Sequence, residues 1–349
     1  MGKTKKMLKN YSPREIIDLF KDLNEPSYRA DQITNWIYKK KILNIDEMTN
    51  LPVYLREKLK NEVNINMLNI KKKLVSPKDG TIKYLFETLD RELLECVVMK
   101  QYYGNTVCIS SQIGCALGCL FCASTKGGLV RNLTSGEMLD QVILAERYSG
   151  EEERINNIVV MGMGEPLYNL NNLIRFLQTA NDAKGLGISL RNITVSTAGI
   201  APKITEFAEE KMPVTLAVSL HAPDDQTRSK IMPINKKYPL KKVLDSCETY
   251  IDKVGRQVTF EYILLAGIND SKKKAYKLAH LIQGRLCHVN LIPANQVDHV
   301  GMKGVQRPDK KRINDFFEIL RENKISVSIR KEQGEDIEGA CGQLRRRNL

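Results

Sequence analysis

Residues 106–122 read Thr-Val-Cys-Ile-Ser-Ser-Gln-Ile-Gly-Cys-Ala-Leu-Gly-Cys-Leu-Phe-Cys, a β-rich apolar run that leads through a glycine into three closely spaced cysteines. The same succession of an apolar run, a glycine-rich or polar turn and an amphipathic helical stretch recurs along the rest of the chain. Strands are predicted to begin near Thr106, Asn157, Asn192, Val214, Gln257 and Cys287. Parallel strands need a crossover, which is usually a helix, so six such units predict an α/β fold built as a barrel or part-barrel.

The carboxyl ends of the strands carry the chemistry in a parallel barrel. Glycines and small polar residues gather at these ends, at Ile113-Gly114-Cys115, Gly162-Met163-Gly164-Glu165-Pro166, Ser196-Thr197-Ala198-Gly199, Ser219-Leu220-His221 and Pro293-Ala294-Asn295. Turns are polar in any fold, which explains part of this pattern without a function. It does not explain the cysteines.

Residues 1–75 precede the barrel pattern and are basic, with 16 Lys and Arg against 9 Asp and Glu, so they hold more than half of the chain's net charge of +13. Ser12-Pro13-Arg14-Glu15 is a capping box with proline at the first helical position, and two further helical runs follow at 28–38 and 51–63. A small helical domain is therefore predicted. Its positive charge is expected of a domain that binds RNA phosphates, and it is equally expected of a basic surface that contacts only solvent.

Residues 76–105 are predicted to form a short β extension, with strands around 83–89 and 93–99, and residues 106–349 to form the barrel and a C-terminal loop. Helices are expected at 136–148, 170–183 and 240–254. Eight cysteines are too few for a disulfide scaffold, and the N-terminus lacks the apolar run of a signal peptide. We therefore expect a reducing, cytoplasmic setting and no membrane span.

Cys115, Cys119 and Cys122 form Cys-x-x-x-Cys-x-x-Cys, a spacing that lets three thiolates surround one inorganic centre. Zinc normally takes four protein ligands, and no fourth cysteine or histidine lies nearby in the sequence. A four-iron, four-sulfur cluster held by three cysteines leaves one iron open for a substrate or cofactor. Two other hypotheses remain: a non-catalytic RNA-binding protein with structural zinc, and a cluster that only transfers electrons.

The cysteine triad, with Phe121 before its last member, resembles the signature of the radical S-adenosylmethionine (SAM) enzymes. Residues 162–166 resemble that superfamily's clamp on the methionine amine. The strings Val195-Ser196-Thr197-Ala198-Gly199, Ser219-Leu220-His221-Ala222-Pro223 and Ala340-Cys341-Gly342-Gln343-Leu344 are similar to the RlmN family of adenine carbon-2 RNA methyltransferases. The resemblance covers nearly the whole chain and implies a partial (βα)6 radical SAM barrel. One departure is Gln296, where the family commonly has proline.

Membership of this family would imply methylation of carbon 2 of adenosine in 23S rRNA, at the peptidyl-transferase centre, and in tRNA at adenosine 37. It would also imply a [4Fe–4S] cluster, two SAM molecules per turnover, an electron donor such as flavodoxin or ferredoxin, and a monomer. The cluster ligands would be Cys115, Cys119 and Cys122. The SAM contacts would be Gly164, Glu165, Ser196, Ser219, Leu220, His221 and Asn295.

Carbon 2 of adenine is electron-poor and does not attack the methyl group of SAM, whereas a thiolate does. By resemblance, Cys341 carries the methyl group, and Gly339-Ala340-Cys341-Gly342 has so little side-chain bulk that it could form a mobile loop. By the same resemblance, Cys108 releases the RNA and forms a transient disulfide with Cys341, and Glu95 accepts a proton.

The residues alone leave other interpretations open. Cys108 could equally be a small buried residue that only fills space in the core. Cys341 could be a C-terminal residue without a role, and Glu95 could be an ordinary exposed residue of a strand. Cys96, Cys247 and Cys287 match no motif and are expected to be packing residues. The sister family Cfr, which methylates carbon 8, is the nearest alternative; Pro166 favours carbon 2, because Cfr has alanine there.

Overall fold

The computed structural model describes residues 5–102, 104–150, 154–294, 306–339 and 343–344. Its main feature is a ten-stranded sheet in the order β14-β13-β12-β11-β10-β9-β6-β5-β4-β3. The strands from β6 to β14 pair in parallel, and the two ends of the sheet do not pair with each other. The sheet is therefore a partial barrel, as the sequence predicted.

The six predicted parallel strands are confirmed, and a seventh, β14 (Val327–Ile329), adds to their edge. The six are β6 (Asn105–Cys108), β9 (Ile155–Val160), β10 (Ile193–Thr197), β11 (Thr215–Ser219), β12 (Val258–Leu264) and β13 (Cys287–Pro293). In β9, β10 and β13, buried residues alternate with partly exposed ones, as expected of strands with only one fully covered face.

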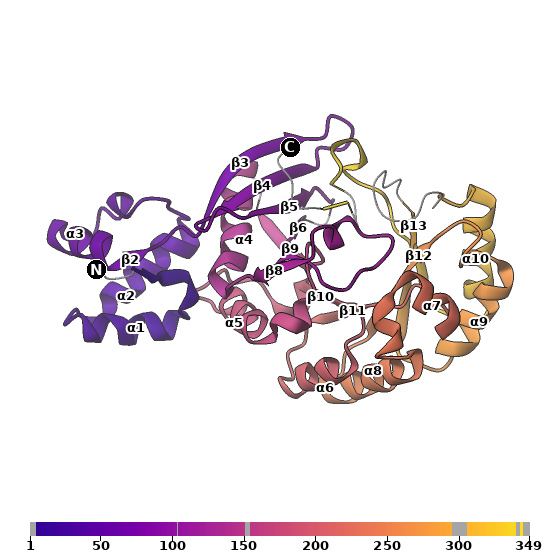
Figure 1. Cartoon of the computed structure of the whole chain (residues 1–349). Helices are drawn as coiled ribbons and strands as arrows, with labels where there is room; N and C mark the ends of the chain where they lie inside the picture. Colours follow the sequence, from indigo (N-terminus) through magenta and orange to yellow (C-terminus); the bar gives the residue numbers. More distant parts are fainter. Residues whose placement is uncertain (1–4, 103, 151–153, 295–305, 340–342, 345–349) are drawn as a thin grey trace.

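Helices cover the outer face of the partial barrel (Figure 1). They are α4 (Ser135–Ser149), α5 (Leu170–Asn181), α6 (Ala201–Glu209), α7 (Asp225–Ile231), α8 (Leu240–Val254), α9 (Lys272–Ile282) and α10 (Lys310–Glu322). A capping box is present at the start of α4, where Thr134 and Glu137 satisfy each other's backbone N–H groups. Their inward apolar stripes and the sheet share one hydrophobic core.

The other edge of the sheet is antiparallel and consists of β3 (Leu68–Val75), β4 (Ile82–Thr88) and β5 (Leu93–Met99). β4 and β5 confirm the predicted extension. Residues 68–75, predicted as part of the N-terminal segment, form a strand of the main sheet because they pair with β4 from Leu68 to Val75, with one irregularity at Lys71.

The N-terminal helices α1 (Pro13–Asp22), α2 (Ser27–Thr34) and α3 (Val53–Glu62) form a unit on the left of Figure 1, with α3 farthest from α4 and α5. α2 continues into a π-helical turn at Asn35–Lys39, and the short strands β1 (Lys6–Met7) and β2 (Val63–Asn64) pair in parallel. Asp140 of α4 fixes this unit: it pairs with buried Lys9 and accepts the backbone N–H of Met67 at 2.6 Å. Among the described residues, no helix is long and apolar enough to cross a membrane.

Candidate functional site

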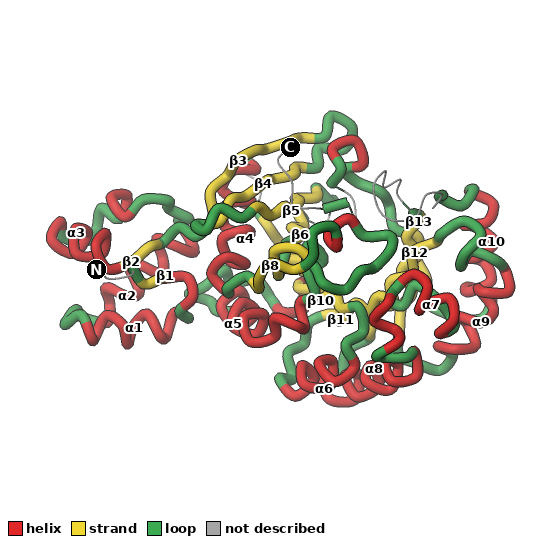
Figure 2. Tube along the Cα trace, viewed as in Figure 1, coloured by secondary structure: helices red, strands yellow, loops and turns green. Residues whose placement is uncertain are grey.

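The three clustered cysteines lie on a loop closed by a small hairpin, β7 (Gln112–Gly114) and β8 (Leu129–Asn132), which Figure 2 shows in front of the main sheet. We predicted that Gly114 and Cys115 end a barrel strand; that prediction was wrong, because the barrel strand β6 ends at Cys108 and β7 pairs only with β8. Gly114 has φ +73°, and a Cβ there would stand 2.0 Å from the Gly128 carbonyl oxygen. Only glycine permits this closure.

The surroundings of these thiols suit a metal cluster. Cys115 and Cys119 are buried and Cys122 is half-buried. Burial raises the pKa of the Cys115 thiol to about 11, and burial together with the neighbouring Cys122 and Cys115 raises that of Cys119. Three thiolates gathered here need a cation to offset their charge, and thiolate is the usual ligand of iron–sulfur clusters.

A cavity of about 150 Å³ extends from the cysteines across the carboxyl ends of the strands. No three described Cys, His, Asp or Glu side chains converge on a single-ion site. The ligands of a cubane cluster bind different irons and need not converge in this way. The predicted site residues that line this cavity are Cys115, Cys119, Cys122, Gly164, Glu165, Ser196, Ser219 and His221. Leu220 is buried behind it, and Asn295 lies outside the described residues.

Glu165 is almost completely buried at the edge of this cavity. Its carboxylate accepts the backbone N–H of Ala198 at 2.7 Å and that of Leu167 at 3.1 Å. Burial raises the pKa of the Glu165 carboxyl to about 7, although these N–H groups oppose the shift. The Glu165 N–H donates to the side-chain oxygen of Gln112 at 2.8 Å, and Gly164 leaves room for that side chain. A carboxylate held this way suits an ammonium group.

His221 stays neutral in this environment. Burial, and then the positive Arg228, lower the pKa of its imidazole to about 3. Its Nδ1 accepts the Ile263 N–H at 3.0 Å, so its proton is on Nε2. Its ring packs nearly perpendicular to that of Phe121 on the loop that carries the cysteines, with ring centroids 4.7 Å apart. His221 therefore connects the end of β11 to the loop that carries the three clustered cysteines.

Arg228 of α7 is fully buried behind this cavity and was not predicted from the sequence. Its guanidinium donates to the carbonyls of Ala198 at 2.7 Å, Ser219 at 2.9 Å and Leu220 at 3.0 Å. It thus holds together the ends of β10 and β11 that carry the cavity residues. No local motif marks this arginine, because the contacts form only when two neighbouring strands are placed side by side.

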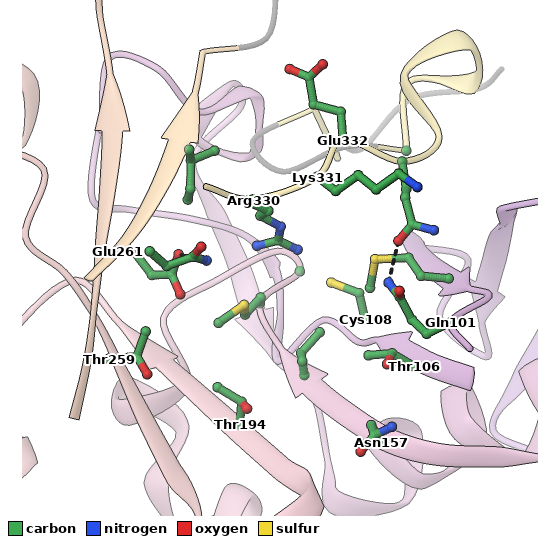
Figure 3. Close-up of a pocket in the computed structure, with 18 of the residues that line it drawn as sticks. Gln101, Thr106, Cys108, Asn157, Thr194, Thr259, Glu261, Arg330, Lys331 and Glu332 are labelled. Carbon is green, nitrogen blue, oxygen red and sulfur yellow. Dashed lines mark hydrogen bonds between the residues drawn. The ribbon is translucent and has the colours of Figure 1, made fainter. Parts of the chain in front are cut away.

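A second cavity of about 480 Å³ adjoins the first and contains Cys108. Figure 3 shows Cys108 and Glu261 on opposite sides of it, with Arg330 between them. Barrel interiors are normally filled by branched apolar side chains. Small polar residues take that place here, which leaves the space open: Thr106, Asn157, Thr194, Thr215 and Thr259 line it. Glu261 lines both cavities and was also missed; a carboxylate inside the apolar strand β12 was its signal.

Cys341 lies outside the described residues, but Gly339 and Leu344 on either side of that gap both line the second cavity. No disulfide joins two described cysteines, so the pairing of Cys108 with Cys341 stays a prediction. Cys96, Cys247 and Cys287 are buried, as expected of packing residues.

Glu95 is fully buried in β5, which corrects the alternative of an exposed strand residue. Its carboxylate forms an ion pair with Lys83 of β4 at 2.9 Å, and the Lys83 side chain is equally buried.

Comparison with known proteins agrees with this geometry. Residues 109–279 match the model of the radical SAM superfamily, and residues 7–65 match that of the ribosomal RNA large subunit methyltransferase N-terminal domain. A probable dual-specificity RNA methyltransferase RlmN from Alkaliphilus oremlandii is 48% identical, with 96% of each chain covered. One from Clostridium novyi is also 48% identical, with 98% of each chain covered. The chain belongs to the RlmN family.

A crystal structure of a radical SAM methyltransferase from Sphaerobacter thermophilus shares the fold, with a TM-score of 0.93 and 42% identity over 97% of this chain and 99% of that one. This RlmN-family protein is therefore a SAM-dependent RNA methyltransferase of the radical SAM type, and such enzymes use a [4Fe–4S] cluster and SAM. The alternatives of a structural zinc protein and of a cluster that only transfers electrons are set aside.

Proposed function

We propose that the protein methylates carbon 2 of adenosine in 23S rRNA and in tRNA through a methyl group carried on Cys341. The observation that carries this proposal is the pair of adjoining cavities. One is bounded by the three cluster cysteines and Glu165, and the other contains Cys108 and the residues that flank Cys341. A carrier cysteine has to meet SAM and then the base, and the two cavities provide a place for each.

The first cavity would hold the cluster on Cys115, Cys119 and Cys122, and SAM beside Glu165. A cluster bound there supplies the electron that cleaves SAM to methionine and the 5′-deoxyadenosyl radical. The Cys341 thiolate first takes the methyl group of one SAM molecule, and the resulting S-methyl group later gives up a hydrogen atom to the radical from the second. The carbon left on Cys341 then bonds to carbon 2 of the adenine.

Release of the RNA depends on two other side chains. The adduct radical has to lose one electron, which the cluster, left oxidised by SAM cleavage, would take back. Glu95 then accepts the proton from carbon 2. The Cys108 thiolate attacks the Cys341 sulfur, and the sulfur–carbon electron pair stays on the carbon, which takes up a proton to become the product methyl group. A dithiol reductant then reopens the Cys108–Cys341 disulfide. The position of Cys108 in the second cavity supports this role.

An anaerobic assay with cluster-loaded protein, SAM, a reductant and RNA tests the proposal. We expect 2-methyladenosine and 5′-deoxyadenosine to form together in rRNA fragments and in tRNA, as measured by mass spectrometry of digested RNA. The assay should work with flavodoxin or ferredoxin as the electron donor and with the protein as a monomer. In the cell, we propose that the protein acts in the cytoplasm. Formation of 8-methyladenosine without 2-methyladenosine would refute the assignment to carbon 2.

A further inference from the structure

Lys83 is a buried lysine that contacts two different parts of the proposed machinery. Its ammonium group lies 2.9 Å from the Glu95 carboxylate and donates to the backbone carbonyl of Glu338 at 3.1 Å. Strand register explains the first contact: Lys83 pairs with Val97, which pairs with Cys108 on the next strand. These residues share one face of the sheet, and Glu95, two residues before Val97, shares it too.

The second contact reaches a segment 255 residues away in the sequence. Glu338 precedes Cys341 by three residues, and its backbone is left-handed, with φ +51°. The same segment is bound to the β3–β4 turn, where Asp79 accepts the Gly334 N–H at 2.8 Å and Ser76 donates to Asp336 at 2.9 Å. The β3–β4 hairpin is therefore the support on which this part of the C-terminal segment rests.

A buried ion pair is costly to desolvate, and well-packed apolar residues often replace one without loss of stability. The Lys83–Glu95 pair therefore needs a reason beyond folding, and the contact to Glu338 provides one. We propose that Lys83 is a positioning residue whose single ammonium group fixes both the Glu95 carboxylate and the backbone that leads into Cys341. This inference rests on the proposed function, in which Glu95 accepts the proton and Cys341 carries the methyl group.

The test separates the two contacts of Lys83 with cluster-loaded, full-length protein under anaerobic conditions. One measurement is the single-turnover rate at which labelled methyl passes from SAM to Cys341, followed by peptide mass spectrometry. This step needs the C-terminal segment in place but does not need Glu95. The other measurement is the fraction of covalent protein–RNA adduct that resolves to methylated RNA, which needs Glu95. Melting temperature is recorded for every variant.

Glu95→Gln is expected to load Cys341 at the wild-type rate and to accumulate adduct. Lys83→Met is expected to slow loading by about tenfold or more, the effect of losing a hydrogen bond from a charged donor, and to lose stability because the buried Glu95 carboxylate loses its ion pair with Lys83. The double variant Lys83→Met/Glu95→Gln also removes the buried carboxylate charge. It should regain stability while loading stays slow, and Lys83→Arg should recover part of the loading rate.

Lys71→Met is the matched control, because it breaks a half-exposed ion pair with Glu87 on the same hairpin without touching the C-terminal segment. Wild-type loading in the double variant would overturn the inference, since Lys83 would then only balance the charge of Glu95. If Lys83→Met does not fold, the loading rate of the double variant decides whether Lys83 positions the C-terminal segment. If the wild-type protein does not load Cys341, the proposed function itself fails; if only the Lys83 variants behave as wild type, the inference alone fails.

Discussion

Replacement of Glu165 by glutamine tests whether the carboxylate in the cavity beside Cys115, Cys119 and Cys122 is charged at a cost to stability. Burial raises the pKa of Glu165 to about 7, above its ordinary value of 4.5. The folded state therefore holds the proton more tightly than the unfolded chain. The stability linked to this proton is fully present below the ordinary pKa and is lost as the pH rises through about 7.

The two pKa values differ by about 2.5 units, or ~3 kcal/mol at high pH. Between about pH 5.5 and about pH 8.5, linkage predicts that the wild-type protein loses ~2 kcal/mol of unfolding free energy that the Gln variant keeps. A constant offset is expected as well, because glutamine has one oxygen for the N–H groups of Ala198 and Leu167. Only the pH-dependent part of the difference in unfolding free energy between the two proteins reports the charge of Glu165.

Urea unfolding of the cluster-free protein and of Glu165→Gln at several pH values measures this change. Glu57→Gln, on the exposed side of α3, serves as the control and should follow the wild-type pH profile. Parallel profiles for wild type and Glu165→Gln would refute the reasoning. The expected divergence would mean that Glu165 is ionised at physiological pH at the expense of stability, ready for the ammonium group of SAM.

Three other changes test the site. Cys108→Ala should still load methyl on Cys341 and then trap RNA as a covalent adduct on denaturing gels; free, fully methylated RNA would contradict its role. Arg228→Met removes the guanidinium hydrogen bonds to the carbonyls of Ala198, Ser219 and Leu220, the last of which still accepts the Ala222 N–H, and should lower the unfolding free energy by about 2–5 kcal/mol in urea titrations. An unchanged midpoint would show that Arg228 does not hold the strand ends together. Gly164→Ala puts a Cβ 2.5 Å from a neighbouring side chain and should weaken SAM binding in equilibrium dialysis by about tenfold or more, whereas Gly267→Ala, with positive φ but open space, should bind SAM normally.

Local patterns predicted most elements because the physics behind them is local. The capping boxes at Ser12 and Thr134 are complete within four residues, and the structure contains both. The apolar runs located six parallel strands, and the helix predicted at 240–254 has those bounds. The hairpin that holds the cysteine loop was missed, since β7 spans only three residues and becomes a strand by pairing with β8.

Charged residues within apolar strands are visible in the sequence, but their neighbours in the chain do not show which partners they have in the fold. Lys83, Glu95 and Glu261 each stand in such a run, and all three are buried. The register of neighbouring strands decides which partner each of them has. Lys83 reaches Glu95 because β4 and β5 are aligned. The Glu261 carboxylate accepts a hydrogen bond of 2.9 Å from the side-chain amide of Asn290, which lies on the parallel neighbour β13.

The sequence by itself determined the type of fold, the cluster motif and the residues at the carboxyl ends of β9, β10 and β11, because spacing along the chain encodes them directly. Only the tertiary structure decided that Arg228 holds two strand ends together and that the small polar residues of the strands leave a cavity beside Cys108. It also decided that Lys83 joins Glu95 to the C-terminal segment. These contacts join residues far apart in the chain, and packing alone brings them within hydrogen-bonding distance.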